Sequence, residues 1–296
     1  MDGIVNVNKQ AGMTSFDVVF HCRKIFDTRK IGHTGTLDPM ATGVLPVCVG
    51  KGTKLVEFLM ADDKVYTATL QLGLVTDTQD STGQVLSRND RPVPASLVRE
   101  TVQSFVGDSL QVPPMYSAIK VSGQKLVDLA RKGVEIPREA RPVTIYAIDM
   151  VEEDPQARRY VLRVHCKKGT YIRSLCHDIG QRLGVGGVMA SLHRNRSGVF
   201  DETTAVTLDE LRAAREEGRL EQLLLPVESA FRDWEKLVVD SRQEELIRHG
   251  VRLALSRLQI GDDERPVAVY NERGELLMAA EKLWEADSLR QLRSFY

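Results

Sequence analysis

The chain has 296 residues, which is enough to bury a sizeable core and to form one large domain and a small one. It is 42% hydrophobic and 27% charged, has no apolar run near the roughly 20 residues of a membrane span, and lacks the start of a signal peptide. We therefore expect a cytoplasmic protein without a membrane partner. The net charge of −1 does not point to nucleic acid, and the four cysteines form no C-x-x-C pair, which argues against a disulfide framework or a zinc ribbon.

The first predicted helix covers residues 14–26, where Thr14 or Ser15 can cap it and apolar residues recur on one face. The glycine-rich segment GHTGTLDPMATGVL follows at residues 32–45. Its single carboxylate, Asp38, has no other acid within ten residues on either side. Pro39 stiffens the next step, and the glycines at positions 32, 35 and 43 permit backbone angles that other residues resist. We interpret this segment as a loop that holds one acid in place.

Alternating apolar residues predict strands at residues 64–73 and 159–166. A Lys-Lys-Gly turn then leads into a helix at residues 170–183, which Thr170 can cap and Gly184 can end. Residues 163–196 carry only one acid against seven cations, an excess expected where a phosphate backbone binds. These cations are Arg163, Lys167, Lys168, Arg173, Arg182, Arg194 and Arg196.

The C-terminal third changes in character. Residues 203–225 read as charged and helical, and a boundary is expected at residues 225–227. Short strand-like runs follow at residues 236–239 and 266–270, with a hairpin turn at 271–274. These patterns predict an α+β fold: a mixed, largely antiparallel sheet flanked by helices in residues 1–232, and a small β-rich domain in residues 233–296.

Arg173 falls in the first turn of its predicted helix, where the helix dipole disfavours a cation. A nearby anion would offset this cost, and Asp38 or a phosphate could serve. A solvated surface arginine is the alternative.

Several segments resemble one family. Residues 32–45 match every fixed position of the active-site motif G-H-x-G-x-L-D-P-x-A-x-G-x-L of the TruB family of tRNA pseudouridine synthases. Residues 169–175, GTYIRSL, resemble the family motif whose arginine pairs with the catalytic aspartate. Residues 64–80 resemble its tyrosine motif, and residues 111–120 and 191–198 match two further blocks. The resemblance extends from residue 3 to about 200, with Gln10 standing where proline is usual.

The resemblance implies a pseudouridine synthase fold and, in position and size, a C-terminal PUA-like RNA-binding domain. It implies isomerisation of uridine to pseudouridine in the T-arm loop of tRNA, at the position usually numbered 55, with the base flipped out of the RNA. Asp38 would act as a nucleophile on C6 of the base or C1′ of the ribose, and Arg173 would keep Asp38 ionised. Tyr66 would stack on the base and take a proton.

The same resemblance implies the substrate contacts. Leu192 would form an apolar wall of the pocket, and His33 would fill the gap that the flipped base leaves. Lys9 and Tyr171 are further expected substrate-binding residues. No metal and no cofactor are implied, tRNA is the expected partner, and a monomer is the family expectation.

Other functions remain open at this point. A tRNA-binding protein or folding chaperone without catalysis is one, although a pure binder gains nothing from an acid that faces phosphate. A nucleotide-dependent enzyme using residues 184–187, GVGG, is disfavoured because this run follows a helix rather than a strand. A guide-RNA-dependent isomerase is disfavoured because no long basic extension is present.

Overall fold

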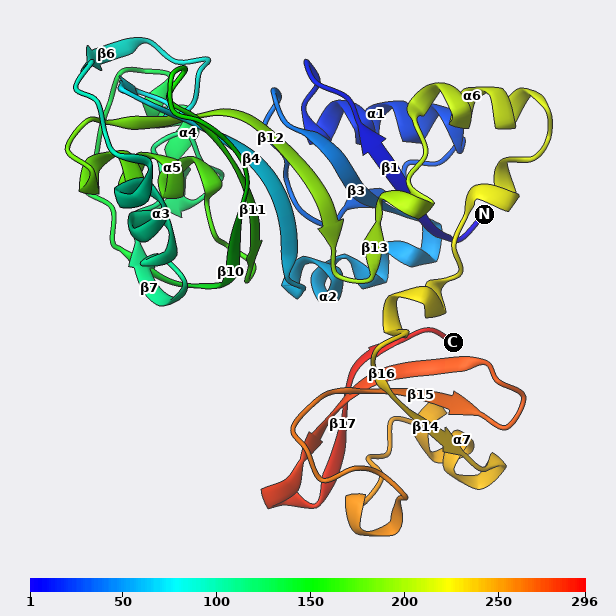
Figure 1. Ribbon diagram of the computed structural model, residues 1–296. Coiled ribbons are helices and arrows are strands. Elements are labelled where there is room, and N and C mark those ends of the chain that lie inside the picture. The colour runs from blue at the N-terminus through cyan, green and yellow to red at the C-terminus, as the bar shows by residue number, and fades with distance from the viewer.

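The computed structural model describes residues 1–296 and arranges them in two parts, each built on its own sheet (Figure 1). The larger part holds a nine-stranded sheet with helices packed beside it, and the smaller part holds a four-stranded sheet. In Figure 1 the smaller part lies below the end of the large sheet that carries β1 and β3. The predicted α+β fold with a mixed, largely antiparallel sheet is confirmed.

One parallel pairing interrupts the large sheet. Across the sheet the strands follow the order β1 (Gly3–Lys9), β3 (Thr42–Val49), β12 (Gly187–Ser197), β4 (Lys64–Leu72), β11 (Arg159–Cys166), β10 (Arg141–Asp154) and β7 (Gly107–Gln111). Two short strands join at its side, β2 (Ile31–His33) on β3 and β13 (Phe200–Asp201) on β12. Every pairing is antiparallel except β3 with β12, which sets His193 beside Thr42 and Arg194 beside Gly43.

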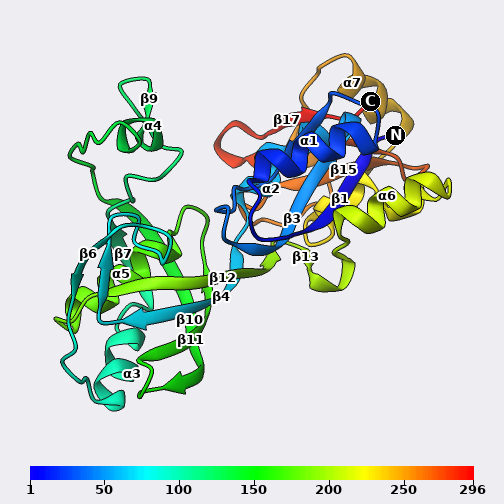
Figure 2. The same cartoon turned by 90° about the horizontal axis from the view of Figure 1, so that it is seen from above.

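The helices of the larger part are α1 (Ser15–Ile25), α2 (Val56–Ala61), α3 (Ala95–Gln103), α4 (Leu126–Ala130), α5 (Ile172–Arg182) and α6 (Leu208–Glu216). Short 3-10 helices occur at η1 (Gly50–Leu55), η2 (Glu202–Thr204), η3 (Leu220–Leu223) and η4 (Val227–Phe231). Two hairpins complete this part, β5 (Leu74–Thr76) with β6 (Val85–Arg88) and β8 (Lys120–Val121) with β9 (Gln124–Lys125). Figure 2 shows that β9 and α4 project away from the body. None of the helices combines the length and apolar character that crossing a membrane demands.

Local sequence explains the first helix. Thr14 and Asp17 form a capping box, in which each side chain accepts a hydrogen bond from the other residue's backbone N–H. The apolar stripe of α1 is buried in the main core, as its spacing predicts. The strands predicted at 64–73 and 159–166 are confirmed as β4 and β11, which pair with each other.

Three local predictions are wrong in part. Helix α5 begins at Ile172 with Tyr171 as its N-cap residue and without a side-chain cap, because the Thr170 hydroxyl instead donates to the carbonyl of Lys167 at 2.9 Å. Residues 203–225 form η2, α6 and η3 rather than one helix. Gly32 lies in strand β2 and does not adopt a positive φ, whereas Gly35 and Gly43 do.

The smaller part consists of β14 (Glu235–Val239), α7 (Ser241–Arg248), η5 (Leu255–Arg257), β15 (Val267–Asn271), β16 (Leu276–Leu283), η6 (Trp284–Ala286) and β17 (Ser288–Ser294). The strands predicted at 236–239 and 266–270 are confirmed, and the predicted turn joins β15 to β16. Eleven buried apolar residues form a core inside this part.

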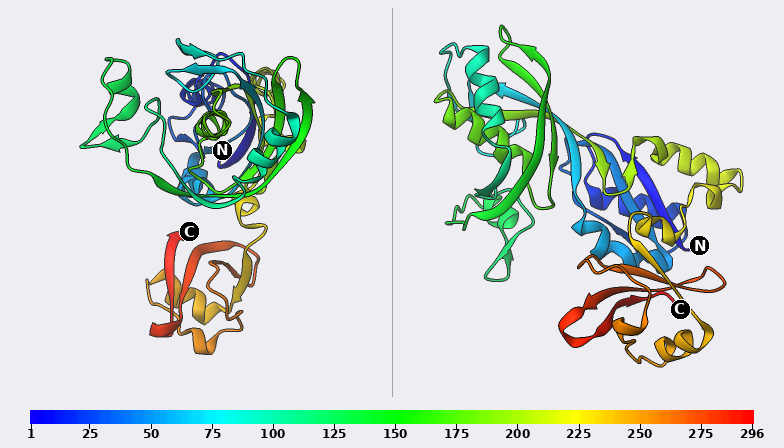
Figure 3. Two further views of the ribbon diagram at one scale, coloured as in Figure 1. Left: turned by 60° about the vertical axis from the view of Figure 1, so that its left-hand side comes forward. Right: turned by 60° about the horizontal axis from the view of Figure 1, so that its bottom comes forward.

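An aromatic cluster joins the two parts. The Phe231 ring is fully buried and lies edge-on to Phe58 of α2, with the ring centroids 6.3 Å apart. Trp234 and Phe295 pack against the same ring at 4.8 and 5.7 Å. Figure 3 shows the smaller part beside this side of the large sheet from two further directions. Helix α2 therefore packs on the smaller part, close to the start of β4.

Candidate active site

The loop that carries Asp38 is fixed from behind. The carbonyl of Asp38 accepts a hydrogen bond from the Ala41 N–H at 3.0 Å, which closes a turn with Pro39 at its second position. The Lys9 ammonium donates to the carbonyls of Pro39 and Ala41, at 3.2 and 2.5 Å. The Ser15 hydroxyl accepts from the Leu37 N–H at 2.8 Å. The backbone on both sides of Asp38 is therefore held by the N-terminal segment.

A pocket of about 430 Å³ opens in front of this loop. That volume lies within the range of small-molecule sites, roughly 300–1,000 Å³. Five of the predicted site residues line it, namely Asp38, Tyr66, Tyr171, Arg173 and Leu192. Its lining also carries the cations Lys64, Lys167, Lys168, Arg173 and Arg194. Five cations against the single carboxylate of Asp38 make this pocket suited to an anionic substrate.

Arg173 joins the two walls of the pocket. Its Nε lies 3.0 Å from Oδ2 of Asp38, and one Nη donates to Oδ1 at 3.1 Å, which gives a two-pronged ion pair. The same guanidinium donates to the carbonyls of Thr78 and Tyr116, at 3.2 and 2.8 Å. Asp80 lies 3.7 Å away on its other side. The Arg173 side chain is only 6% exposed, so its position is tightly defined.

Burial and the ion pair act on Asp38 in opposite directions. Burial is the larger effect and raises the pKa of the carboxyl above its ordinary value, while the adjacent Arg173 lowers it. The nearby carboxylate of Asp80 raises the pKa further, because two negative charges repel. Asp38 therefore depends on Arg173 for its charge, and desolvation makes the ionised form more reactive than a hydrated surface carboxylate.

Tyr66 and Leu192 give the pocket an apolar side. They come from the neighbouring strands β4 and β12, and Leu192 pairs in register with Ala68, two residues after Tyr66. Leu192 is 8% exposed, and Tyr66 packs against the main core. Burial raises the pKa of the Tyr66 phenol, and the guanidinium of Arg194 works against this rise. A flat ring fits such a wall.

Two predicted substrate-binding residues lie outside the pocket lining. Lys9 is 1% exposed, and burial lowers the pKa of its ammonium to about 8. It contacts the back of the Asp38 loop, which indicates support for the loop rather than contact with substrate. His33 lies at the base of the loop, where its Nδ1 accepts from the Gly35 N–H at 3.3 Å. Burial and Arg194 lower the pKa of His33, which favours the neutral ring.

The predicted basic strip is not one surface. Arg173 and Arg194 are buried, at 5% and 1% exposure. Arg182 stacks on Phe105 at the far end of α5, with its guanidinium carbon 4.5 Å from the ring centroid. Only Lys167 and Lys168 are exposed cations at the pocket. The seven cations of residues 163–196 therefore lie in separate environments, because strand and helix periodicity sends these side chains in different directions.

Three residues that shape the site were not among the predicted site residues: Asp80, Gln111 and Arg194, the last of which was named only as a cation of the basic strip. Asp80 is buried and shares Arg173 with Asp38, and its Oδ1 accepts hydrogen bonds from the hydroxyls of Thr78 and Thr82. Gln111 exchanges two hydrogen bonds with the backbone of Tyr171, at 2.8 and 3.1 Å, and so stands in for the missing helix cap. Arg194 lies under the Asp38 loop. The conspicuous Thr-Asp-Thr-Gln-Asp run was the available signal for Asp80.

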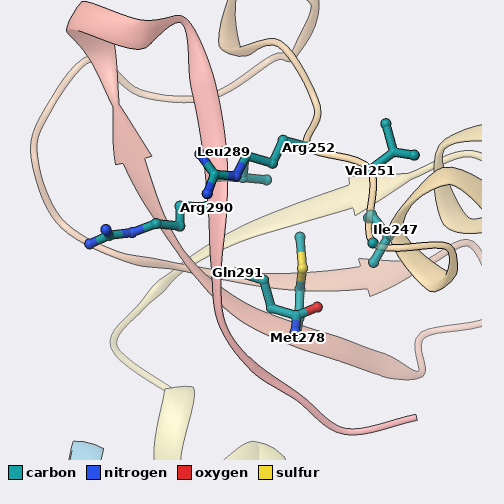
Figure 4. Close-up of a pocket in the computed structure, with 8 residues that line it drawn as sticks. Ile247, Val251, Arg252, Met278, Leu289, Arg290 and Gln291 are labelled. Atoms are coloured by element: carbon teal, nitrogen blue, oxygen red, sulfur yellow. The ribbon is translucent and has the colours of Figure 1, made fainter.

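The smaller part has a pocket of its own, shown in Figure 4. Its volume of about 170 Å³ is below the usual range of ligand sites. Arg252 and Arg290 border it, but Arg290 is paired with Glu281. No three His, Cys, Asp or Glu side chains in the chain converge in a way that could hold a metal ion. The pocket around Asp38 is the better candidate for chemistry.

Two family models match the chain. The N-terminal domain of the TruB family pseudouridylate synthases matches residues 23–172, and the C-terminal domain of tRNA pseudouridylate synthase B matches residues 173–232. In the structure the second match covers α5, β12, β13 and α6, which belong to the larger part.

Whole-chain relatives agree. The tRNA pseudouridine synthase B of Clostridium novyi is 46% identical over 278 residues, which cover 94% of each chain. That of Alkaliphilus oremlandii is also 46% identical, over 86% of this chain and 83% of the relative. A chain from a crystal structure of a Cbf5-Nop10-Gar1 complex superposes with a TM-score of 0.78 at 29% identity, covering 99% of this chain and 85% of that chain. A chain from an H/ACA RNP bound to a substrate RNA containing 2′-deoxyuridine gives a TM-score of 0.76 at 27% identity, with 99% and 85% covered.

Proposed function

This chain belongs to the TruB family of pseudouridine synthases, enzymes that isomerise uridine. We propose that it converts the uridine at position 55, in the T-arm loop of tRNA, to pseudouridine. The name of its relatives, tRNA pseudouridine synthase B, supports tRNA as the substrate. The observation that carries the proposal is the two-pronged pair of Arg173 with Asp38, the only carboxylate that lines the pocket. The two exposed cations at the pocket, Lys167 and Lys168, suit the phosphates of an RNA strand.

Asp38 is the nucleophile in this proposal. The reaction breaks the bond between N1 of the base and C1′ of the ribose, and forms a bond between C5 and C1′. The proton leaves C5, and N1 gains one, so that substrate and product are isomers. Attack by the Asp38 carboxylate, on C6 or on C1′, divides this change into easier steps. Arg173 keeps the carboxylate ionised against the effect of burial.

The base must leave the RNA to reach Asp38. Flipping costs a few kcal/mol, which contacts in the pocket have to offset. Tyr66 stacks on the flipped uracil and accepts a proton, Leu192 packs on it, and Tyr171 borders the opening. His33 fills the gap left in the RNA loop. The neutral ring of His33 is compatible with this role, since an uncharged imidazole can stack on the neighbouring bases without the desolvation of a charge.

We further propose that residues 1–232 form the catalytic domain and residues 233–296 a PUA-like RNA-binding domain, in a protein that acts as a monomer. The four-stranded sheet and the separate buried core support this division. Neither matched family model extends beyond residue 232.

Tritium release from tRNA labelled at C5 of uridine tests the function. Wild-type protein is expected to release tritium and Asp38→Asn is not, although both bind the tRNA. A tRNA with cytidine in place of uridine 55 is the matched substrate control and should release none above background. Tritium release from the tRNA with cytidine 55 would show that a different uridine is modified. Release by Asp38→Asn would reject the nucleophile, and no release by wild type would leave an RNA-binding or chaperone role.

A further inference from the structure

Arg194 lies between the two halves of the active site. Strand β12 runs parallel to β3 on one side and antiparallel to β4 on the other. Arg194 is consequently in register with Gly43 on β3 and with Tyr66 on β4. No other residue of the chain pairs with both the strand that leaves the Asp38 loop and the tyrosine of the pocket.

The Arg194 side chain bridges the two arms of the Asp38 loop. Its Nε donates to the carbonyl of Val44 at 2.7 Å, and one Nη donates to the carbonyl of Gly35 at 3.1 Å. Gly35 precedes Asp38 by three residues and Val44 follows it by six, so one guanidinium ties together the backbone on both sides of the carboxylate. Its contacts complement those of Lys9, which holds the turn from behind.

The positive charge of Arg194 has no ionic partner. The residue is 1% exposed and has no carboxylate within 4.0 Å, unlike Arg173, which has two. A buried cation without an ionic partner is costly, even when carbonyl groups accept its hydrogen bonds. A neutral residue could pack here at lower cost. The field of this cation falls on the phenol of Tyr66, which it helps to ionise, and on Lys64 and His33, whose pKa values it lowers.

A guanidinium can donate hydrogen bonds but cannot accept them. Those of Arg194 go to the carbonyls of Val44 and Gly35, so its effect on the Tyr66 phenol is that of a nearby positive charge. A tyrosine that accepts a proton from the substrate must first be ionised, and a fixed neighbouring cation stabilises that form.

We propose that Arg194 is a positioning residue, which holds the two arms of the Asp38 loop in one fixed arrangement beside Tyr66 and acts through these groups rather than on the RNA. The inference rests on the proposed function, because it takes the roles of Asp38 and Tyr66 from there. It predicts that loss of Arg194 slows the chemical step while leaving RNA affinity intact.

The test compares Arg194→Gln and Arg194→Lys with wild type. Arg196→Gln is the matched control, because Arg196 lies two residues further along β12, pairs with Asp63 at 3.2 Å and does not line the pocket. The measurements are kcat and KM from tritium release, tRNA affinity and thermal melting. Arg194→Gln is expected to lower kcat about 10- to 100-fold, since small displacements of reacting groups have effects of this size. KM and tRNA affinity should stay close to wild type. Arg194→Lys should be intermediate, and the control should match wild type.

Three results would overturn the inference: an unchanged kcat in folded Arg194→Gln, a change confined to KM, or a loss of kcat equal in Arg196→Gln. If Arg194→Gln melts near the assay temperature, Arg194→Ala assayed at lower temperature with millimolar guanidinium replaces it. Recovery of kcat by guanidinium, and none by urea of the same shape, supports positioning by a cation. Equal behaviour with both additives rejects it. Wild-type activity in the same assay reports separately on the proposed function.

Discussion

The guanidinium of Arg173 lies 3.0 Å from the carboxylate of Asp38, although 135 positions separate the two residues in the chain. The pairing depends on the register of the large sheet and on the start of α5, which Gln111 holds through the backbone of Tyr171. The pair also explains how α5 tolerates the cation Arg173 in its first turn, where the helix dipole disfavours positive charge. Asp38 provides the anion that offsets the helix dipole.

The pair predicts a pH effect. Arg173 lowers the pKa of Asp38, whereas burial and Asp80 raise it. Replacing Arg173 by glutamine removes the lowering effect, so the pKa of Asp38 should rise further above its ordinary value. Activity that needs ionised Asp38 is lost as pH falls through this pKa. The acidic limb of the kcat/KM profile should therefore move to higher pH.

Arg182→Gln is the control for this prediction. Arg182 belongs to the same helix but donates to the Ser104 hydroxyl at 2.7 Å, away from the pocket. Its pH profile should match that of wild type. An acidic limb that stays in place in Arg173→Gln, at any level of activity, would show that Arg173 does not control the charge of the essential acid.

Tyr66→Phe separates stacking from proton transfer. Phenylalanine keeps the ring that we propose stacks on the base but removes the hydroxyl. We expect tRNA affinity within about threefold of wild type and a kcat lower by about 100-fold or more, the usual contribution of a positioned acid or base. Tyr146→Phe removes a hydroxyl from a half-exposed tyrosine on β10 that lines no part of the pocket, and should leave kcat unchanged. A normal kcat in Tyr66→Phe would limit Tyr66 to stacking.

Local patterns predicted much of this fold. The helix at α1 and the strands β4, β11, β14 and β15 follow from apolar periodicity and capping residues close together in sequence. The parallel pairing of β3 with β12 does not, because it joins residues about 150 apart and depends on the whole sheet. Arg194 takes its position from that pairing, so its burial under the Asp38 loop could not be predicted from its neighbours in sequence.

The site was predictable to a similar degree. Motif resemblance identified Asp38, Tyr66 and Arg173, which line one pocket together. It could not tell that Lys9 is buried behind the loop, because the type of a residue does not reveal which side of a loop it contacts. For the same reason, the sequence could not tell which arginines of residues 163–196 are buried. Their burial depends on the face of the strand or helix from which each side chain projects.

Gly43→Ala tests the close approach of β3 to β12. Gly43 has a φ of +100°, and an added Cβ would lie 2.3 Å from the carbonyl oxygen of Arg194. We expect the free energy of unfolding to fall by about 3 kcal/mol or more, since strain and backbone overlap combine. Gly12→Ala is the control. Gly12 has a φ of +87° but nothing near its Cβ position, so only the strain of about 1–2 kcal/mol applies. Urea unfolding measures both variants. An equal loss of unfolding free energy in Gly43→Ala and Gly12→Ala would contradict the close contact between β3 and β12.

A second groove predicts where the RNA strand continues beyond the pocket. This groove, of about 530 Å³, shares Met60 and Lys168 with the pocket around Asp38 and is bordered by Arg293 from the smaller part. Arg293 is paired with Glu57 at 3.2 Å, and the ammonium of Lys54 donates to the carbonyl of Ser294 at 2.9 Å, which leaves Lys168 as the cation free to meet a phosphate. An RNA strand that leaves the pocket along this groove would contact both parts of the protein.

Lys168→Gln should therefore weaken tRNA binding without slowing the reaction at saturating tRNA. The slope of log affinity against log salt should decrease in magnitude by about 0.7–0.9, the value for one phosphate contact. Arg252→Gln, at the pocket of Figure 4, removes a cation from the smaller part away from this groove and should leave the slope unchanged. Filter binding at several salt concentrations measures both variants. A slope that changes in Arg252→Gln but not in Lys168→Gln would direct the RNA across the other face of the smaller part.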